Sequence, residues 1–506
     1  MKQLLTTLLL LSFFHSQAQW SMDPAAPMVL CNAENAQSGL KVISDGSGGW
    51  YAFWSDARAN ASLSQLYGQH LDVHGNALWT ANGMLIMDQP DSSIHENLPL
   101  LLPNGDILIS YIYGTTGNQQ QVLRNMRLAP DGSEVWAAPV ELTRQSTGPL
   151  GNISIFYGIN AFVSGNGVWL AWGYVAQGAN ASYAFERMDL DGTTHFGAPG
   201  HGTNGIGWGP FSFRDDLAGG FILDWGEGGS GGDLKAIRYA PTGTPVWTGP
   251  ITVSTGTSGL ATARATVSDS MGSYVSVFVP TGDLGMAQYD TSGAFIWTPP
   301  RYACTESHDQ DKPSIVLENN NLFVAWADNR PPAFNQDMYM QKIDMAGNLL
   351  WPAGGVPVIQ IGTYIPTPLV VAGDEGAVIA TFDGNTGFVA RRVLSDGSLD
   401  WPAPVPFCSA GFNPAYDRQV VLSDGMGGVT AFWQTLSTSH LYAAHIDKFG
   451  NPGDHIGISE IEGAAPLNIY PDPASDQVTI SAGEAMRSIQ VLGMDGRLLL
   501  SSVTGL

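Results

Sequence analysis

The sequence predicts an all-β fold built from about eight copies of one unit, and three observations support this. Glycine is abundant at 61 residues, and the chain carries 15 Trp, 16 Tyr and 20 Phe, whereas only 13% of its 506 residues are charged. A glycine recurs every 50 to 60 residues and is usually followed four positions later by an aromatic residue. A second aromatic ends an alternating apolar segment in every copy. Many short strands joined by Gly-rich turns are typical of β-repeat folds.

The first anchor of the repeat is a turn glycine. It occurs at Gly75, Gly132, Gly192, Gly243, Gly293, Gly347, Gly397 and Gly450. The aromatic four residues later is Trp79, Trp136, Phe196, Trp247, Trp297, Trp351 or Trp401. The eighth copy departs from this rule, because Asp454 stands at that position.

The second anchor ends an alternating strand. It is Trp54, Tyr111, Trp172, Trp225, Phe278, Trp326, Phe382 or Trp433. One strand precedes the strand that carries this anchor and two follow it, so each unit contains about four strands. This arrangement is typical of a β-propeller of about eight four-stranded blades, with seven blades or an open solenoid as alternatives. We expect the aromatic anchors to pack between blades; a row of rings that stack on sugars is the alternative reading.

The two ends of the repeat region favour ring closure. Residues 26–31 resemble the last strand of other units, for example residues 404–408, whereas no convincing fourth strand follows Gly450. The N-terminal strand is therefore expected to complete the eighth blade. Such a closure removes exposed sheet edges, which are otherwise sites of aggregation.

The N-terminus predicts a secretory signal peptide over residues 1–18. Lys2 supplies the positive start, residues 4–14 are apolar, and Ser16 and Ala18 are the small residues expected before a cleavage site. The apolar run is too short to remain as a membrane-spanning helix. We expect the mature chain to begin at Gln19 and to contain no transmembrane span. The propeller is expected over residues 25–458.

A different pattern begins near the C-terminus. Residues 467–476 read L-N-I-Y-P-D-P-A-S-D, and apolar runs at residues 488–492 and 497–500 flank Asp495-Gly496, a hairpin signal. This segment resembles the type A C-terminal sorting domain of the type IX secretion system of Bacteroidetes-like bacteria. It departs from that family at Asp472, where Asn is usual, and the family's later strands and basic end are not seen before Leu506. The resemblance implies an incomplete β-sandwich-like sorting segment over residues 466–506, recognition by the secretion machinery, and a location outside the cell or on its outer surface.

The charge of the chain argues against nucleic acid as a partner. The formal net charge is −24 and the isoelectric point is near 4.5, so a phosphate backbone would be repelled. The three cysteines, Cys31, Cys304 and Cys408, stand in similar settings and form no metal-binding spacing. We interpret them as one small buried position sampled in three blades, too far apart for a disulfide.

One polar motif recurs at the end of the second strand. The first and sixth units share W-x-D-x-R, with Asp56 and Arg58 in one and Asp328 and Arg330 in the other. An Asp can bind turn amides and a nearby Arg can pair with it, which is a structural role. These four residues are also our candidate ligand-binding residues, although the two units are not neighbours and should not form a tight catalytic pair.

Other chemistry receives little support from the sequence. Glu306, Asp309 and Asp311 cluster in one loop and could hold Ca²⁺, with a solvated loop as the alternative. We expect no other cofactor, since no nucleophile elbow, phosphate loop or dinucleotide motif occurs in a suitable context. The Asp-Gly-Trp spacing of the repeat also differs from the sialidase Asp-box.

The sequence therefore leaves three functional hypotheses. The leading one is a secreted propeller that binds a glycan or a surface protein and is not itself an enzyme. The alternatives are a hydrolase or lyase acting on extracellular polysaccharide, and a structural component of the cell surface. The fold alone does not decide among them.

Overall fold

A computed structural model describes most of the chain in two compact units, divided between Asp454 and His455. The described residues are 20–88, 92–114, 121–142, 153–176, 181–196, 211–226, 232–255, 264–269, 272–279, 282–297, 301–330, 336–361, 368–383, 387–412, 414–453, 467–470, 479–482, 489–492 and 498–502. The predicted signal peptide lies outside them.

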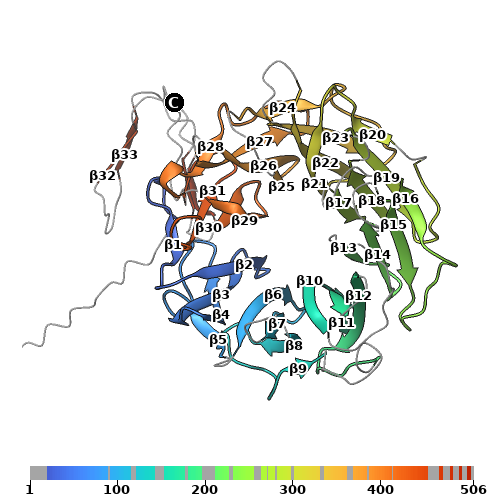
Figure 1. Cartoon of the computed structure of the whole chain (residues 1–506). Helices are drawn as coiled ribbons and strands as arrows, with labels where there is room; N and C mark the ends of the chain where they lie inside the picture. Colours follow the sequence, from blue (N-terminus) through green and yellow to red (C-terminus); the bar gives the residue numbers. More distant parts are fainter. Residues whose placement is uncertain are drawn as a thin grey trace, which may run out of the picture. The chain divides into compact units, whose positions relative to one another are not determined.

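The first unit is a ring of eight antiparallel sheets, which confirms the predicted eight-bladed propeller (Figure 1). In blades 1 to 7 the strands of each sheet follow one another in sequence, and the first strand of each blade lies nearest the centre of the ring. Seven sheets have four strands, and the third has three within the described residues. The described part of the chain contains a single short helix, the 3-10 turn η1 (Ala410–Phe412).

The strands of blades 1 to 4 have the following bounds. Blade 1 contains β2 (Gln37–Ser44), β3 (Trp50–Asn60), β4 (Leu63–Leu71) and β5 (Met84–Met87); blade 2 contains β6 (Ser93–Leu101), β7 (Ile107–Gly114), β8 (Gln121–Leu128) and β9 (Val140–Glu141); blade 3 contains β10 (Ile153–Ser164), β11 (Gly167–Ala176) and β12 (Ala181–Asp189); blade 4 contains β13 (Phe211–Asp215), β14 (Phe221–Gly226), β15 (Leu234–Tyr239) and β16 (Ile251–Ser254).

The remaining blades complete the ring. Blade 5 contains β17 (Arg264–Ser268), β18 (Ser273–Phe278), β19 (Leu284–Asp290) and β20 (Arg301–Cys304); blade 6 contains β21 (Gln310–Glu318), β22 (Asn321–Asp328), β23 (Asp337–Asp344) and β24 (Val356–Ile359); blade 7 contains β25 (Leu369–Ala372), β26 (Gly376–Asp383), β27 (Gly387–Leu394) and β28 (Val405–Cys408); blade 8 contains β29 (Pro414–Ser423), β30 (Val429–Thr435), β31 (Leu441–Ile446) and, from the N-terminus, β1 (Met28–Cys31).

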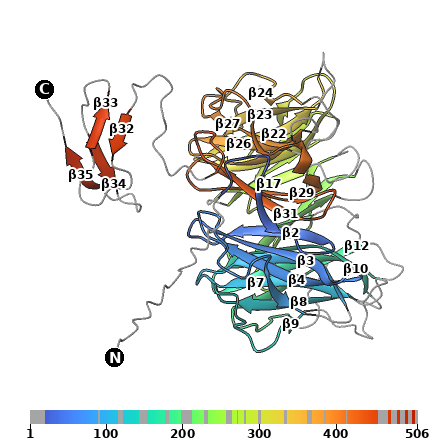
Figure 2. The same ribbon diagram turned by 90° about the vertical axis from the view of Figure 1, so that its left-hand side faces the viewer.

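The N-terminal strand closes the ring, as predicted. Strand β1 pairs antiparallel with β31, with Met28 opposite Ala443 and Val29 opposite Tyr442. At this junction of blades 8 and 1, which we call the seam, β2 of blade 1 lies beside β29 and β30 of blade 8 (Figures 1 and 2). The last blade is therefore built from both ends of the repeat region, which leaves no open end in the ring.

The glycine anchor of each unit occupies a turn that requires a left-handed backbone. All eight anchor glycines have φ between +73° and +92°, a region that side chains with a Cβ rarely adopt. We call this turn, between the third and fourth strands of a blade, the Gly-aromatic turn. The positive φ explains why glycine recurs at a fixed interval in the sequence.

The aromatic anchors of these turns link each blade to the next. Seven indole N–H groups donate to a backbone carbonyl in the Gly-aromatic turn of the following blade, at 2.8–3.3 Å. The pairs are Trp20–Val73, Trp79–Pro130, Trp136–Leu190, Trp247–Thr291, Trp297–Met345, Trp351–Ser395 and Trp401–Lys448. Phe196 takes the corresponding position in blade 3, where no indole N–H is available.

Trp20 explains the break in the eighth copy. Asp454 replaces the expected aromatic because blade 8 receives its fourth strand, and with it this aromatic, from the N-terminus. Trp20 is 2% exposed, and its ring packs edge-on against Trp50 with the ring centroids 5.5 Å apart. The sequence therefore contains all eight anchors, but one lies at the opposite end of the chain.

The second set of aromatic anchors fills the interior between blades. Trp54, Trp326 and Trp433 are fully buried, and Phe382 is the one partly exposed member of the set. This confirms inter-blade packing. The three cysteines are free and buried, as expected from their similar settings.

The second unit is described by itself. It contains two antiparallel strand pairs, β32 (Leu467–Tyr470) with β33 (Thr479–Ala482) and β34 (Ile489–Leu492) with β35 (Leu498–Ser502). The antiparallel pairing of β34 with β35 agrees with the predicted hairpin, whose turn at Asp495-Gly496 lies outside the described residues. Among the described residues of both units, no helix has the length and apolar character needed to cross a membrane.

Candidate functional site

The W-x-D-x-R motifs form two matching buried clusters, which we call the Asp–Arg clusters. They contain Trp54, Asp56 and Arg58 in blade 1 and Trp326, Asp328 and Arg330 in blade 6. Both lie at the end of the second strand of a blade, and both carboxylates are excluded from solvent. Removing a carboxylate from water is costly unless its oxygens are fully hydrogen-bonded.

Each carboxylate is satisfied by four donors from its own cluster. Asp56 accepts from Trp54 Nε1 at 2.8 Å, from the Arg58 backbone N–H at 2.8 Å, and from Arg58 Nε and Nη2 at 3.0 and 2.7 Å. Asp328 has the same four partners at 2.6–3.0 Å. Burial alone would raise the pKa of Asp56, but the hydrogen bonds from Arg58 and Trp54 outweigh it and hold this pKa below its ordinary value.

The arginines of the clusters bind structural groups as well. Arg58 Nη2 donates to the Asn82 carbonyl at 2.6 Å and to Cys31 Sγ at 3.2 Å, and Arg330 Nη2 donates to Gly354 and Cys304 in the same way. Each guanidinium also lies over a tyrosine ring, Tyr67 or Tyr339, about 4 Å from its centroid. Burial raises the pKa of Cys31 and Cys304 to about 11, so both thiols stay protonated.

This geometry gives the four predicted ligand-binding residues a clear structural role. The structure brings Asp56 together with Arg58, and Asp328 with Arg330, but the two pairs lie in blades that are not neighbours. The arginine side chains retain 21% and 18% exposure, whereas the carboxylates have none. Ligand binding through these residues stays a prediction.

The loop with the predicted calcium ligands shows separate local contacts. The backbone of Asp309 accepts from the Asn329 N–H at 3.1 Å, and Asp311 Oδ1 accepts from the Lys312 N–H at 2.7 Å. Among the residues the structure describes, no three His, Cys, Asp or Glu side chains converge as metal ligands would. This holds for Glu306 as well as for Asp309 and Asp311, and calcium binding by this loop stays a prediction.

A second repeated polar pattern lies at the opposite end of the second strand, and therefore on the opposite face of the ring. In each case a basic residue pairs with an Asp of the same blade. The basic residue lies on the third strand, two positions before the Gly-aromatic turn. The Asp lies beside the turn that links the first and second strands. The pairs are His70–Asp45 at 3.1 Å, Arg127–Asp106 at 2.6 Å, Arg238–Asp216 at 2.9 Å and His445–Asp424 at 3.1 Å. We call these the hairpin ion pairs.

Within the described residues, blades 3, 5, 6 and 7 lack such a pair, and blade 6 differs in its turn as well. Its basic residue is Lys342, and its turn is shortened to Asn319 and Asn320, which have φ of +48° and +58°. Glu318 stands where blade 1 has Asp45, but its Oε1 accepts from the Asn319 amide at 3.4 Å. Lys342 Nζ instead donates to the Ser395 carbonyl of blade 7 at 3.1 Å and to the Ser395 hydroxyl.

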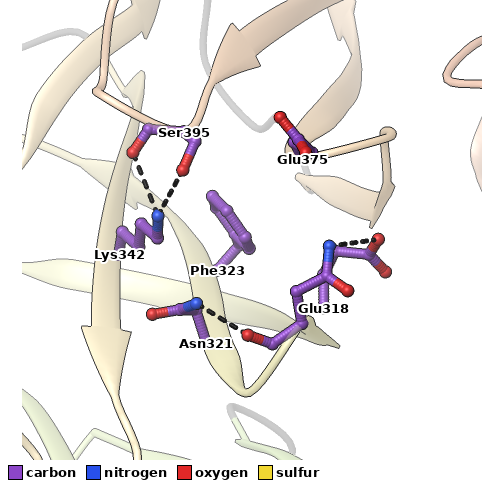
Figure 3. A pocket seen from close by; sticks show the side chains of 7 residues that line it. Glu318, Asn321, Phe323, Lys342, Glu375 and Ser395 are labelled. Atoms are coloured by element: carbon purple, nitrogen blue, oxygen red, sulfur yellow. Dashed lines mark hydrogen bonds between the residues drawn. The ribbon is translucent and has the colours of Figure 1, made fainter.

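A polar pocket of about 440 Å³ occupies this place between blades 6 and 7 (Figure 3). We call it the interblade pocket; its lining residues are Glu318, Asn319, Asn321, Phe323, Lys342, Glu375 and Ser395. Figure 3 shows Phe323 between the Lys342–Ser395 pair on one side and Glu318 and Glu375 on the other. Phe323 is the one apolar residue of the lining.

The lining supplies hydrogen-bonding groups of both kinds. Lys342 and the Asn amides donate, and the carboxylates of Glu318 and Glu375 accept. Lys342 Nζ lies over the Phe323 ring, 5.6 Å from its centroid, and Phe323 is itself buried, so the ring supports the ammonium from beneath while the polar groups face the pocket. Such a surface suits a ligand with many hydroxyl groups better than an apolar one. Sequence reasoning missed this pocket because its signal is a shortened turn, not a motif.

Comparison with known proteins assigns the C-terminal segment. Residues 468–505 match the family model of the secretion system C-terminal sorting domain. The chain is thus an exported cargo of the type IX secretion system: an eight-bladed β-propeller followed by a sorting domain that marks proteins secreted to the extracellular space or the outer cell surface. No curated protein sequence matches the chain.

The solved structures that resemble the chain do so only distantly. A puromycin hydrolase shares 13% identity at a TM-score of 0.42, over 83% of this chain and 62% of that one. A protein of unknown function from Dyadobacter fermentans shares 14% identity at a TM-score of 0.38, over 62% of this chain and 96% of that one. An ulvan lyase of polysaccharide lyase family PL25 shares 12% identity at a TM-score of 0.38, over 61% and 79%. Likenesses this remote carry no argument about binding or catalysis.

Proposed function

We propose that the chain is a secreted binding module whose propeller holds an extracellular glycan in the interblade pocket. The observation that carries the proposal is the polar lining of this pocket, whose side chains supply both donors and acceptors of hydrogen bonds. The hydroxyl groups of sugars both donate and accept hydrogen bonds, so they match a lining of this kind.

The volume of the pocket fits a small portion of a glycan chain. Binding pockets for small molecules usually measure about 300–1,000 Å³, and this one lies in the lower half of that range. Its position between two blades is also favourable, because the ring supports every lining residue on a strand or a short turn. A site built on rigid elements loses less conformational entropy when a ligand binds.

The chemistry of the lining favours neutral sugars over strongly charged ones. Lys342 brings one positive charge, and Glu318 and Glu375 bring two negative ones. Hydrogen bonds from Ser398 lower the pKa of Asp396 in blade 7, and the positive charge of Lys342 lowers it further. Asp396 is therefore a third carboxylate near Lys342. An acidic sugar would meet these carboxylates, whereas hydroxyl groups can donate to them.

A glycan array probed with the full-length mature protein tests the proposal. We expect binding to neutral polysaccharides, and at least a tenfold loss of affinity in Lys342→Ala and in Glu375→Gln. The matched control is Glu34→Gln, an exposed carboxylate at the other face of the ring, which should bind as the wild type does. Array binding that both pocket variants retain, or turnover of the polysaccharide in place of binding, would contradict the proposal.

A further inference from the structure

The point where the ring closes contains an unusual histidine. His445 lies on β31, is 7% exposed, and forms the hairpin ion pair of blade 8 with Asp424. Blades 2 and 4 place Arg127 and Arg238 at the equivalent position, which carry a permanent charge. The two blades that meet at the seam, 8 and 1, use histidine, whose charge changes near neutral pH.

Both ring nitrogens of His445 face hydrogen-bond acceptors. Nε2 lies 3.1 Å from Asp424 Oδ2, and Nδ1 lies 3.2 Å from the Gly453 carbonyl oxygen. A carbonyl oxygen cannot donate a hydrogen. Asp424 cannot donate either when ionised: burial favours its neutral form, but hydrogen bonds, led by that from His445, outweigh this and lower its pKa. Two acceptors are satisfied together only by an imidazolium, which carries a hydrogen on each nitrogen.

The partners of His445 are the parts that meet at the seam. Gly453 is the last described residue of the ring, and its N–H donates to the His445 carbonyl at 2.9 Å. The Trp20 ring, from the N-terminal segment, lies 6.0 Å from the imidazole, and the Trp20 carbonyl approaches Gly453 closely. Through one hydrogen bond from each ring nitrogen, the imidazole therefore joins two parts of the chain. One is the segment where the chain leaves the ring, and the other is the blade that the N-terminus completes.

The other charged and titratable groups around this site are placed differently. Asp447 and Lys448 follow β31 in the Gly-aromatic turn, where Asp447 Oδ1 accepts from the Phe449 and Asn451 N–H groups. Asp72 and His74 belong to the blade 1 turn that receives Trp20, where Asp72 Oδ1 accepts from the His74 N–H. Thr430 of β30 lies opposite His445 in the sheet. In the described part of the chain, the imidazole hydrogen bonds go to Asp424 and Gly453.

We propose that protonated His445 stabilises the seam of the propeller, so that ring closure is pH-sensitive. In mildly acidic solution the imidazolium holds Asp424 and Gly453 at once. In alkaline solution the neutral ring can donate from one nitrogen only, so one of the two acceptors loses its partner and is left buried. The two hydrogen bonds of the imidazolium therefore stabilise the closed ring in mildly acidic solution, and one of them is lost in alkaline solution.

The test compares melting temperatures of the full-length mature protein between pH 5.5 and pH 8.5. We expect the wild type to melt at a lower temperature at pH 8.5, and His445→Arg to lose most of this dependence, because Arg fills the equivalent place in blades 2 and 4. The matched control is His70→Arg at the blade 1 pair, where one imidazole nitrogen has a described partner. This control should keep most of the wild-type dependence.

A second measurement reads the protonation state of His445 in the wild-type protein directly. Nitrogen NMR of the wild-type protein with labelled histidine reports whether each ring nitrogen carries a hydrogen, and comparison with His445→Arg assigns the signal. The expected result is a hydrogen on both ring nitrogens of His445 at pH 5.5 and on one of them at pH 8.5. A neutral His445 at pH 5.5, or a His445→Arg variant with the full wild-type pH dependence, would overturn the proposal.

Discussion

Replacing Trp20 by Ala tests whether the N-terminal segment is a structural part of the ring. Trp20 is buried at the seam, packs edge-on against Trp50, and donates its indole N–H to the Val73 carbonyl at 2.8 Å. Truncation of a buried Trp costs about 3–5 kcal/mol. The lost hydrogen bond, worth about 0.5–1.5 kcal/mol, falls within that total.

The expected effect can be converted into a melting temperature. The ring spans residues 20–453, and unfolding entropy of about 2.1 cal/mol/K per residue amounts to roughly 0.9 kcal/mol/K for a ring of this size. Trp20→Ala should therefore lower the Tm by roughly 3–6 °C if the ring unfolds as one unit. Trp20→Phe should lower it less, because Phe196 already serves this position in blade 3.

Differential scanning calorimetry of the full-length mature protein measures this directly. Met22→Ala is the matched control, since Met22 lies two residues away on the same segment but is 62% exposed. Its Tm should stay within about 1 °C of the wild type, because surface substitutions usually change stability by less than about 0.5 kcal/mol. Equal melting of Trp20→Ala and Met22→Ala would refute the reasoning that Trp20 closes the ring.

Three further predictions follow from the same structure. Trp326→Ala removes a fully buried anchor of blade 6 and should cost about 3–5 kcal/mol in calorimetry; unchanged melting would show that the side chain is not enclosed. Asp424→Asn should destabilise the ring at pH 7 and have little effect near pH 2. The pKa of Asp424 is lowered in the folded state, so the ionised carboxylate stabilises the ring at pH values above the ordinary Asp pKa of about 3.9. This stabilisation is lost as the pH falls through the folded-state pKa. Equal destabilisation at both pH values in urea titrations would contradict this sign. Deletion of residues 468–505 should leave the protein inside the outer membrane, as fractionation would reveal, and normal release would exclude the sorting role.

The ring could be predicted from the sequence because its anchors recur at a fixed interval. The turn glycines need a positive φ, and the aromatics fill the same inter-blade position in each unit, so both constraints leave a periodic record. The same reasoning found β1, since residues 26–31 resemble the fourth strand of other blades. It missed Trp20, because the spacing rule looks downstream of Gly450, whereas the chain supplies the eighth aromatic from its other end.

The polar chemistry was harder to predict. The W-x-D-x-R motif was visible as a local pattern, but its partners come from distant parts of the chain: Cys31 contacts Asp56, and the Asn82 carbonyl accepts from Arg58. The hairpin ion pairs join residues about 20 to 25 positions apart, so no short motif marks them. The interblade pocket lies beside the short turn of blade 6, where Lys342 contacts Ser395 of blade 7, and its lining residues come from separate segments of two blades.

Amide hydrogen exchange at the seam tests the closed ring most directly. Strand β1 pairs with β31 and so shares its hydrogen bonds, although the two are separated by most of the chain. A closed propeller predicts that peptides covering residues 28–31 exchange as slowly as those covering residues 441–446, with both released together as denaturant is added. Rapid exchange over residues 28–31, with residues 441–446 still protected, would show that the N-terminal strand is not part of the eighth blade.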